Sequence, residues 1–182
     1  MSAPQSVPDP SAVFRCSADH LPAIQAILNE AILHTTAVYE YEPRSIESME
    51  RWFAERQEAG IPVLGVERAP GELAGFATWG PFRFRPAYKY SAEHSVYVAG
   101  RHRGTGVGRL LLTAILAEAE RAGLHMLVAG IDASNMASIG LHRSAGFTCC
   151  GRVREAGFKF GRWLDLEFWQ RILATPEHPV DG

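Results

Sequence analysis

The sequence predicts a mixed α/β fold built around one sheet. Apolar segments rich in β-branched and aromatic residues alternate with segments whose apolar residues recur at helical spacing. Their order along the chain is β, α, α, β, β, β, α, β, α, β, β, without internal repeats. The clearest unit lies between Glu93 and Gly123, where a strand, a glycine-rich loop and a helix follow one another. A length of 182 residues is enough for one domain with a substantial core.

Two helices are predicted after a short first strand at residues 12–16. Asp19 is placed to cap the first helix and Ser45 to cap the second, because short polar side chains accept hydrogen bonds from the first free amides of a helix. Gly60 is expected to end the second helix. The apolar faces are formed by Ile24, Ile27, Leu28 and Ala31 in the first helix, and by Met49, Trp52 and Phe53 in the second.

A β-hairpin is predicted next, from a strand at 62–67, a turn at 69–72 and a returning strand at 73–79. The following segment, 80–90, is irregular and reads G-P-F-R-F-R-P-A-Y-K-Y. Two interpretations stay open for it: a solvated loop with aromatic anchors, or a loop that binds a small anion. The second rests on its arginines, because a guanidinium group donates two parallel hydrogen bonds to a carboxylate.

The central unit has the features of an anion-binding site. Residues 96–98 favour a strand, 103–108 form a glycine-punctuated turn, and Gly123 lies where the residue after a helix is expected. The apolar positions of the helix are Leu110, Leu111, Ala114, Ile115 and Ala117. Such a loop directs several backbone N–H groups and a helix N-terminus toward one point. A plain strand-to-helix turn is the alternative.

The glycine spacing excludes two common phosphate-binding loops. No Lys follows the glycines, so the pattern G-x-x-x-x-G-K-[ST] is absent. Gly104, Gly106 and Gly108 are spaced G-x-G-x-G, which differs from the dinucleotide pattern G-x-G-x-x-G. The sequence fits R-x-x-G-x-G-x-[GA] from Arg101, and an overlapping R-G-x-G-V-G from Arg103.

The C-terminal part of the chain adds one more helix and the last strands. The helix is capped by Asn135 and stops at Gly146. A tight loop is predicted at 155–162. The remaining strands are predicted at 127–132, 147–152 and 163–169. We expect one domain over residues 12–173, between a flexible lead at 1–11 and a flexible tail at 174–182.

Composition limits the classes of function. A net charge of −2 argues against a protein that binds nucleic acid through phosphate contacts. No apolar run is long enough to cross a membrane, and the N-terminus lacks the basic and apolar regions of a signal peptide. The three cysteines, of which Cys149 and Cys150 are adjacent, show neither a disulfide framework nor metal-ligand spacing. We therefore expect a cytoplasmic protein without a bound metal.

Two ordered motifs resemble the GNAT superfamily of acetyl-CoA-dependent N-acetyltransferases. The first is the glycine loop after a strand. The second is N-x-x-[AS]-x-x-L-Y-x-x-x-G-F, which reads N-M-A-S-I-G-L-H-R-S-A-G-F from Asn135 to Phe147, with His142 where the superfamily usually has Tyr. The resemblance implies the GNAT fold, with a single mixed, mostly antiparallel sheet flanked by helices. It also implies acetyl-CoA as the co-substrate.

Further runs are similar to the phosphinothricin and methionine sulfoximine acetyltransferases. They are A-E-H-S-V-Y-V, S-I-G-L-H-R and G-F-K-F-G-R-W-L-D-L, and the resemblance extends over about residues 14–173. The first and last runs point more to the methionine sulfone and sulfoximine branch. The resemblance implies direct acetyl transfer to the α-amino group of methionine sulfoximine, methionine sulfone or phosphinothricin. It also implies a homodimer.

The resemblance assigns roles to individual residues. Glu93 would take a proton from the substrate ammonium group, although it is alternatively an exposed strand-end carboxylate. His142 would protonate the departing thiolate, since imidazole titrates near neutral pH; the alternative is a hydrogen-bonded structural histidine. The expected cofactor-binding residues are Val96, Tyr97, Val98, Arg103, Gly104, Thr105, Gly106, Val107, Gly108, Arg109 and Asn135. The expected substrate-binding residues are Arg83, Phe84, Arg85, Glu93, His94 and Ser95.

Two other functions stay open at this point. In one, the acceptor is a protein N-terminus or a polyamine; in the other, the chain is a non-catalytic CoA-binding module. The bulky segment 83–90 favours a closed pocket over an open peptide groove. The presence of both Glu93 and His142 favours an enzyme.

Overall fold

A computed structural model describes residues 13–181 and confirms the mixed α/β fold. Within this range one sheet of seven strands has the order β1-β2-β3-β4-β5-β7-β6. β4 and β5 are parallel, and all other neighbouring pairs are antiparallel. Helices and strands follow one another in the predicted order. The predicted lead, 1–11, lies outside the described residues.

The bounds of the elements agree with the predicted segments to within a few residues in most cases. The strands are β1 (Val13–Arg15), β2 (Leu64–Ala69), β3 (Glu72–Pro81), β4 (Ser91–Val98), β5 (Met126–Asp132), β6 (Thr148–Lys159) and β7 (Arg162–Ile172). The helices are α1 (Leu21–His34), α2 (Ile46–Glu58), α3 (Val107–Arg121) and α4 (Met136–Ser144). The predicted caps of α2 and α4 are confirmed, because the amide of Ser48 donates to Ser45 Oγ and that of Ser138 to Asn135 Oδ1.

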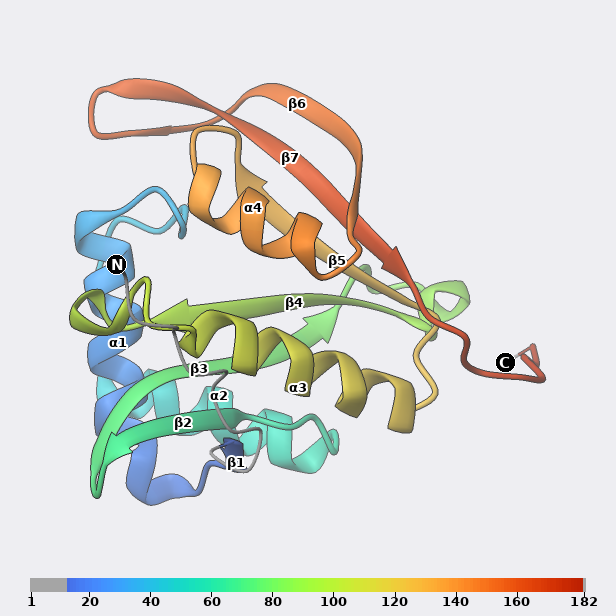
Figure 1. Cartoon of the computed structure of the whole chain (residues 1–182), viewed down its shortest axis with the longest axis horizontal. Coiled ribbons are helices and arrows are strands. Elements are labelled where there is room, and N and C mark those ends of the chain that lie inside the picture. Colours follow the sequence, from blue (N-terminus) through green and yellow to red (C-terminus); the bar gives the residue numbers. More distant parts are fainter. Residues whose placement is uncertain (1–12, 182) are drawn as a thin grey trace, which may run out of the picture.

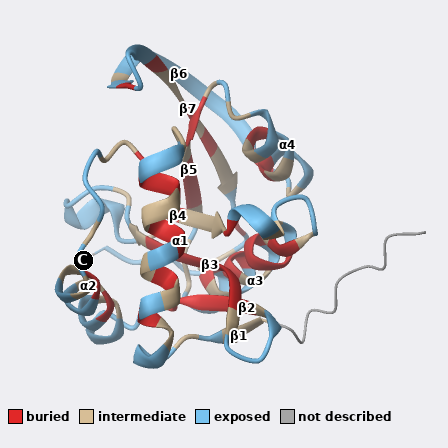
Figure 2. Cartoon of the chain, turned by 90° about the vertical axis from the view of Figure 1, so that its left-hand side faces the viewer, coloured by how far each residue is buried: buried red, intermediate tan, exposed pale blue. Residues whose placement is uncertain are grey.

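The helices lie in two layers on opposite faces of the sheet (Figure 1). α1 and α2 cover one face, and α3 and α4 cover the other. Each layer has its own buried apolar cluster, and Figure 2 shows these residues along the central strands and in the helices. In β4, Val96 and Val98 pack with the α3 layer and Tyr97 with the α1 layer. Because side chains alternate along a strand, Glu93 shares the face of Tyr97, and His94 lies on the opposite face.

The predicted start of the first helix is wrong. α1 begins at Leu21, after a 3-10 turn at Ala18–His20, so Asp19 does not cap it. Ser17 precedes that turn, and its backbone N–H donates to His20 Nδ1 at 3.0 Å. Pro22 lies in the first turn of α1, where its fixed φ angle is compatible with a helix and its missing N–H has no helical partner to lose.

The tight loop predicted at 155–162 is also wrong. β6 continues to Lys159, and the turn to β7 contains only Phe160 and Gly161. Their φ angles are 50° and 73°, and two central residues with positive φ are typical of a type I′ hairpin turn. β6 is irregular between Val153 and Gly157, where its register against β7 shifts. A glycine in the segment 155–159 indicates a loop, but pairing with β7 keeps this segment in the sheet.

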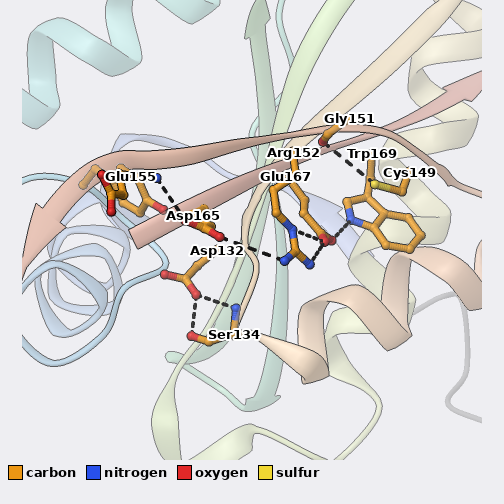
Figure 3. A network of polar contacts seen from close by, with 10 residues as sticks. Asp132, Ser134, Cys149, Gly151, Arg152, Glu155, Asp165, Glu167 and Trp169 are labelled. Atoms are coloured by element: carbon orange, nitrogen blue, oxygen red, sulfur yellow. Dashed lines mark hydrogen bonds and ion pairs between the residues drawn. The ribbon is translucent and has the colours of Figure 1, made fainter. Parts of the chain in front are cut away.

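A charged network joins β6 to β7 (Figure 3). Arg152 on β6 donates from Nη2 to Glu167 Oε1 on β7 at 2.5 Å, and Trp169 Nε1 donates to the other carboxylate oxygen at 2.8 Å. Both contacts lower the pKa of Glu167, with Arg152 the larger cause. The edge strand of the sheet is thus fixed to its neighbour by side chains as well as by the backbone.

Candidate active site

The sheet opens between its two parallel strands. Residues 91–93 of β4 pair with 126–128 of β5, but β4 continues to Val98 and β5 to Asp132. Beyond the paired residues the strands separate (Figure 1). A cleft of ≈ 1330 Å³ lies there, lined by 94–98 on one side and 129–132 on the other. Unpaired strand edges offer N–H and C=O groups that an extended ligand can use.

The edge of β4 presents amide groups to this cleft. The N–H of Ala99 donates to Ala74 O on β3 at 2.9 Å. Because N–H groups alternate in direction along a strand, those of Val96 and Val98 point to the opposite edge, toward the cleft. Val96 and Val98 are among the residues expected to bind the cofactor, and their amides are the groups that they offer to it.

The glycine loop forms one end of the cleft. Gly104 and Gly106 have φ angles of 75° and 88°, which other residues rarely adopt, and Gly106 is the N-cap of α3. Within the described chain, the five amides at 104–108 donate to no backbone carbonyl. The Arg109 amide does, to Gly106 O at 3.1 Å, so it is not free for a ligand. Free amides at a helix N-terminus form a site that fits a diphosphate group.

Gly104→Ala is expected to weaken acetyl-CoA binding. A Cβ at this position meets no other atom within 4 Å, so the change acts through the backbone, which is driven away from φ of 75°. We expect the dissociation constant, measured by titration calorimetry, to rise about tenfold, as the loss of roughly one charge-assisted hydrogen bond would produce.

Gly123→Ala provides the matched control, because Gly123 has φ of 71°, no neighbour within 4 Å of its Cβ, and lies beyond the other end of α3. Both variants should lose about 1 kcal/mol of stability, since both force a side chain into the left-handed region. Equal acetyl-CoA affinities for the two variants would contradict the role of the loop.

Most of the expected cofactor residues lie together. The cleft is lined by Val96, Tyr97, Val98, Arg103, Gly104, Thr105, Gly106, Gly108, Arg109 and Asn135. Val107, the first residue of α3, differs because its side chain is fully buried in the core, so only its backbone is available to a ligand. The guanidinium of Arg103 is already engaged, with Glu30 on α1 at 3.3 Å and with the Val98 carbonyl at 3.2 Å.

Glu93 lies at the point where the two strands begin to separate. Its carboxylate occupies the space in front of Gly130 on β5, where a Cβ would come within 3.0 Å of Glu93 Oε1. Burial raises the pKa of the Glu93 carboxyl, and the positive charge of Arg83 offsets part of the rise. A carboxylate with a raised pKa in a partly buried position is suited to accept a proton near neutral pH.

The arginine-rich segment lies at the other end of β4 from the glycine loop. Arg83, Phe84 and Arg85 are exposed and do not line the cleft; Phe84 is 91% exposed. The guanidinium of Arg83 packs on the ring of Phe82, 4.4 Å from its centre. The fold therefore brings the expected cofactor residues together in the cleft. The expected substrate residues of segment 83–85 lie outside it, and their one link to Glu93 is the effect of the Arg83 charge on the pKa of Glu93.

His94 and His142 are both buried and in contact. Their Nε2 atoms are 3.0 Å apart, and His142 Nδ1 lies 2.8 Å from the carbonyl oxygen of Ser138. Burial and the neighbouring His142 lower the pKa of His94 to about 3, and burial also lowers that of His142. His94 therefore contacts α4 and Phe147, on the face of the sheet opposite Glu93. Ser95, on the same face as Glu93, lines the cleft.

Asp132 is a cleft residue that sequence reasoning did not identify. It ends β5, is 4% exposed, and its Oδ1 accepts hydrogen bonds from the amide and the hydroxyl of Ser134 (Figure 3). Its Oδ2 has no partner among residues 13–181. The signal for it was present in the sequence, because an acidic residue directly follows the apolar strand 127–131.

Two classes of feature are absent from the described residues. Across them, no group of three or more His, Cys, Asp or Glu side chains is arranged to hold a metal ion. None of the helices found between residues 13 and 181 has the length and apolar character needed to span a bilayer.

Comparison with known proteins identifies similar chains over most of the sequence. Residues 18–169 match the family model of the acetyltransferase (GNAT) domain. An L-methionine sulfoximine/L-methionine sulfone acetyltransferase of Pseudomonas aeruginosa is 44% identical over 153 residues, which cover 84% of this chain and 89% of that protein. A phosphinothricin N-acetyltransferase of Alcaligenes faecalis is 41% identical over 156 residues, 85% of this chain and 79% of that protein.

A solved structure extends the likeness to three dimensions. An acetyltransferase from Salmonella typhimurium, crystallised with its cofactor acetyl-CoA, has a TM-score of 0.88 and 40% identity. The match covers 93% of this chain and 96% of the other.

Proposed function

The chain belongs to the GNAT acetyltransferase family, and from this premise we propose that it acetylates the α-amino group of a small amino-acid analogue. The family and its acetyl-CoA-bound member identify the chain as an acetyl-CoA-dependent N-acetyltransferase. The acceptors that we propose are methionine sulfoximine, methionine sulfone and phosphinothricin, the amines named for its relatives.

The observation that carries the proposal is the position of Glu93. Its half-buried carboxylate lies where β4 and β5 begin to part, in front of the missing side chain of Gly130. An α-ammonium group must lose a proton before its nitrogen can attack a thioester. Glu93 takes that proton, directly or through one water, and the amine nitrogen then bonds to the acetyl carbonyl carbon. The amides of Val96 and Val98 stabilise the negative charge that develops on the carbonyl oxygen.

The carbon–sulfur bond then breaks, and the departing thiolate needs a proton. The attacking nitrogen must in turn lose its second proton. We assign the transfer of a proton from this nitrogen to the thiolate to His142, which lines the cleft on the α4 side: the neutral ring accepts a proton at one nitrogen and releases the proton of the other, and is neutral again afterwards. Both ring nitrogens of His142 make contacts inside the protein, with His94 and with Ser138. The transfer therefore requires these contacts to open. No covalent acyl-enzyme is needed, because the amine attacks the thioester directly.

Recognition of the acceptor carboxylate is assigned to Arg83 and Arg85, with Phe84 between them. The charge of Arg83 already acts on Glu93, which supports a position near the acceptor. Arginine suits this role, because its guanidinium binds a carboxylate through two parallel hydrogen bonds.

We also propose a homodimer. β6 lies at the edge of the sheet, and its exposed apolar side chains include Val153 and Phe158, with Trp163 opposite on β7. An exposed apolar edge strand is a surface that proteins normally cover. Light scattering should give twice the chain mass; a monomer mass at micromolar concentration would contradict this part of the proposal.

A panel of acceptors tests the proposed activity. The protein is mixed with acetyl-CoA and each of the three analogues, a short peptide with a free N-terminus, or a polyamine, and thiol release is followed. We expect release with at least one analogue and none with the peptide or polyamine. Release with the peptide or polyamine alone would support the rival acceptor class. Binding of acetyl-CoA without release for any amine would support a non-catalytic module.

A further inference from the structure

The contact between His94 and His142 determines which nitrogens carry protons. A carbonyl oxygen can only accept a hydrogen bond, so the 2.8 Å contact between His142 Nδ1 and the Ser138 carbonyl places a proton on Nδ1. A neutral imidazole has one N–H, so Nε2 of His142 carries a lone pair. Two nitrogens 3.0 Å apart require a proton between them, and this proton then belongs to Nε2 of His94.

The surroundings of the pair favour the neutral forms used in this assignment. Each ring is 4% exposed, and the ring of Phe147 packs against both, with centroids 5.2 Å from His94 and 5.1 Å from His142. Burial disfavours the charged form of a histidine and lowers both pKa values. Two imidazolium rings at this distance would also repel each other.

His94 donates this hydrogen bond from Nε2. Its Nδ1 is buried and has no hydrogen-bond partner in the part of the chain that the structure describes. A backbone contact with Val128 opposes part of the fall in the pKa of His94. The polar function of the His94 side chain is therefore directed at His142.

We infer that His94 is a positioning residue, whose Nε2–H holds His142 in the tautomer that has its proton on Nδ1 and its lone pair on Nε2. The inference rests on the proposed function in one respect: it assigns His94 an effect on turnover through the role of His142 in acetyl transfer. His94 lines the cleft, but its side chain lies on the face of β4 opposite Glu93, so we assign its effect to the contact with His142 and not to a contact with the acceptor amine.

The contact with His94 determines which nitrogen of His142 carries the proton. With Nε2 facing His94, the proton that neutral His142 carries is on Nδ1, beside Ser138, and Ser138 also lines the cleft. Without the donor at position 94, the buried Nε2 lone pair loses its partner, and the ring is free to turn or to exchange tautomers. The orientation of His142 then depends on Ser138 alone.

Two variants of His94 separate donation from shape. His94→Phe keeps a ring of similar size but has no donor, whereas His94→Gln offers an amide N–H near the position of Nε2. We expect kcat to fall about tenfold in His94→Phe, as the loss of one buried hydrogen bond implies, and to recover most of that loss in His94→Gln. Acetyl-CoA affinity should be unchanged in both. Equal rates for wild type and His94→Phe, or no recovery in His94→Gln, would overturn the inference.

The tautomer is read independently of activity from long-range 1H–15N spectra of the 15N-labelled protein. Wild type should show His142 protonated on Nδ1 and His94 on Nε2, with each remaining nitrogen of the pyridine type. Observation of the reverse tautomer, or of a doubly protonated ring at neutral pH, would overturn the assignment. If the protein acetylates none of the amines, the proposed function fails, while these spectra still decide the state of the pair.

Discussion

Glu93→Gln is expected to lower kcat by about a hundredfold to a thousandfold, which lies within the range that general bases contribute. Glutamine has nearly the same shape and fits the space in front of Gly130, but it cannot accept the ammonium proton. The Kd for acetyl-CoA should stay at the wild-type value, because the amides of the glycine loop are untouched. Steady-state thiol release gives the rate, and titration calorimetry gives the affinity.

Glu58→Gln is the control, since Glu58 ends α2 and is exposed. Its kcat should equal that of wild type. A Glu93→Gln variant with more than half of the wild-type rate would remove Glu93 from the base role. A variant that loses acetyl-CoA binding as well would show that Glu93 supports the fold of the cleft instead.

The pH dependence follows from the raised pKa of Glu93. A base acts only when it is deprotonated, so wild-type kcat/KM should begin to fall at a higher pH than an ordinary glutamate would cause. Glu93→Gln should lack this acidic limb.

The stability of the protein should change with pH in the opposite direction to the rate. A carboxyl whose pKa is raised in the folded state destabilises the fold above that pKa, where it must be charged. Thermal unfolding should therefore occur at a higher temperature in Glu93→Gln than in wild type at pH 7, and the difference should vanish in acid.

Lys159→Met is expected to lower the free energy of unfolding by about 3 kcal/mol, because three buried carbonyl oxygens lose a charged donor. Lys159 is 4% exposed, and its Nζ donates to Ile32 O at 2.5 Å, Thr35 O at 2.9 Å and Val38 O at 2.7 Å. Burial lowers the pKa of this ammonium group. Its three protons nevertheless all have acceptors, two at the C-terminal end of α1 and one, Val38 O, in the loop that follows. Methionine fills the same space and leaves these carbonyls without a donor.

The chain contains one other lysine, Lys89, in the exposed segment before β4. Lys89→Met makes the same chemical change at the surface and should alter stability by less than about 0.5 kcal/mol. Urea unfolding followed by circular dichroism compares the two variants. If the free energies of unfolding of Lys159→Met and Lys89→Met differ by less than about 1 kcal/mol, then the contact between the β6–β7 turn and α1 does not stabilise the fold.

Local features of the site were predictable because they depend on a few neighbouring residues. Gly104 and Gly106 adopt positive φ angles, which glycine tolerates without a steric penalty. Asn135 caps α4 through the amide three residues later, a contact within one turn of chain. Geometry of this kind depends only on residues close together in the sequence, so the loop and the cap could be predicted without a structure.

Contacts between distant residues could not be predicted in the same way. Nothing around position 94 in the sequence indicates that its side chain meets a residue 48 positions later. The loop predicted at 155–162 is wrong for a related reason. Gly161 does lie in the turn, but Gly157, which is also a local signal for a turn, is held in β6 by its long-range pairing with Leu164 of β7.

By itself, the sequence determined the order of the elements, the anion-binding loop and the likeness to the acetyltransferases, because each follows from short-range stereochemistry or from motifs of fixed spacing. Only the tertiary structure decided that β4 and β5 part beyond Glu93, and that His94 faces α4 while Glu93 faces Gly130. These outcomes depend on which strands become neighbours and on which face each helix packs. The free energies involved come from contacts between segments far apart in the chain.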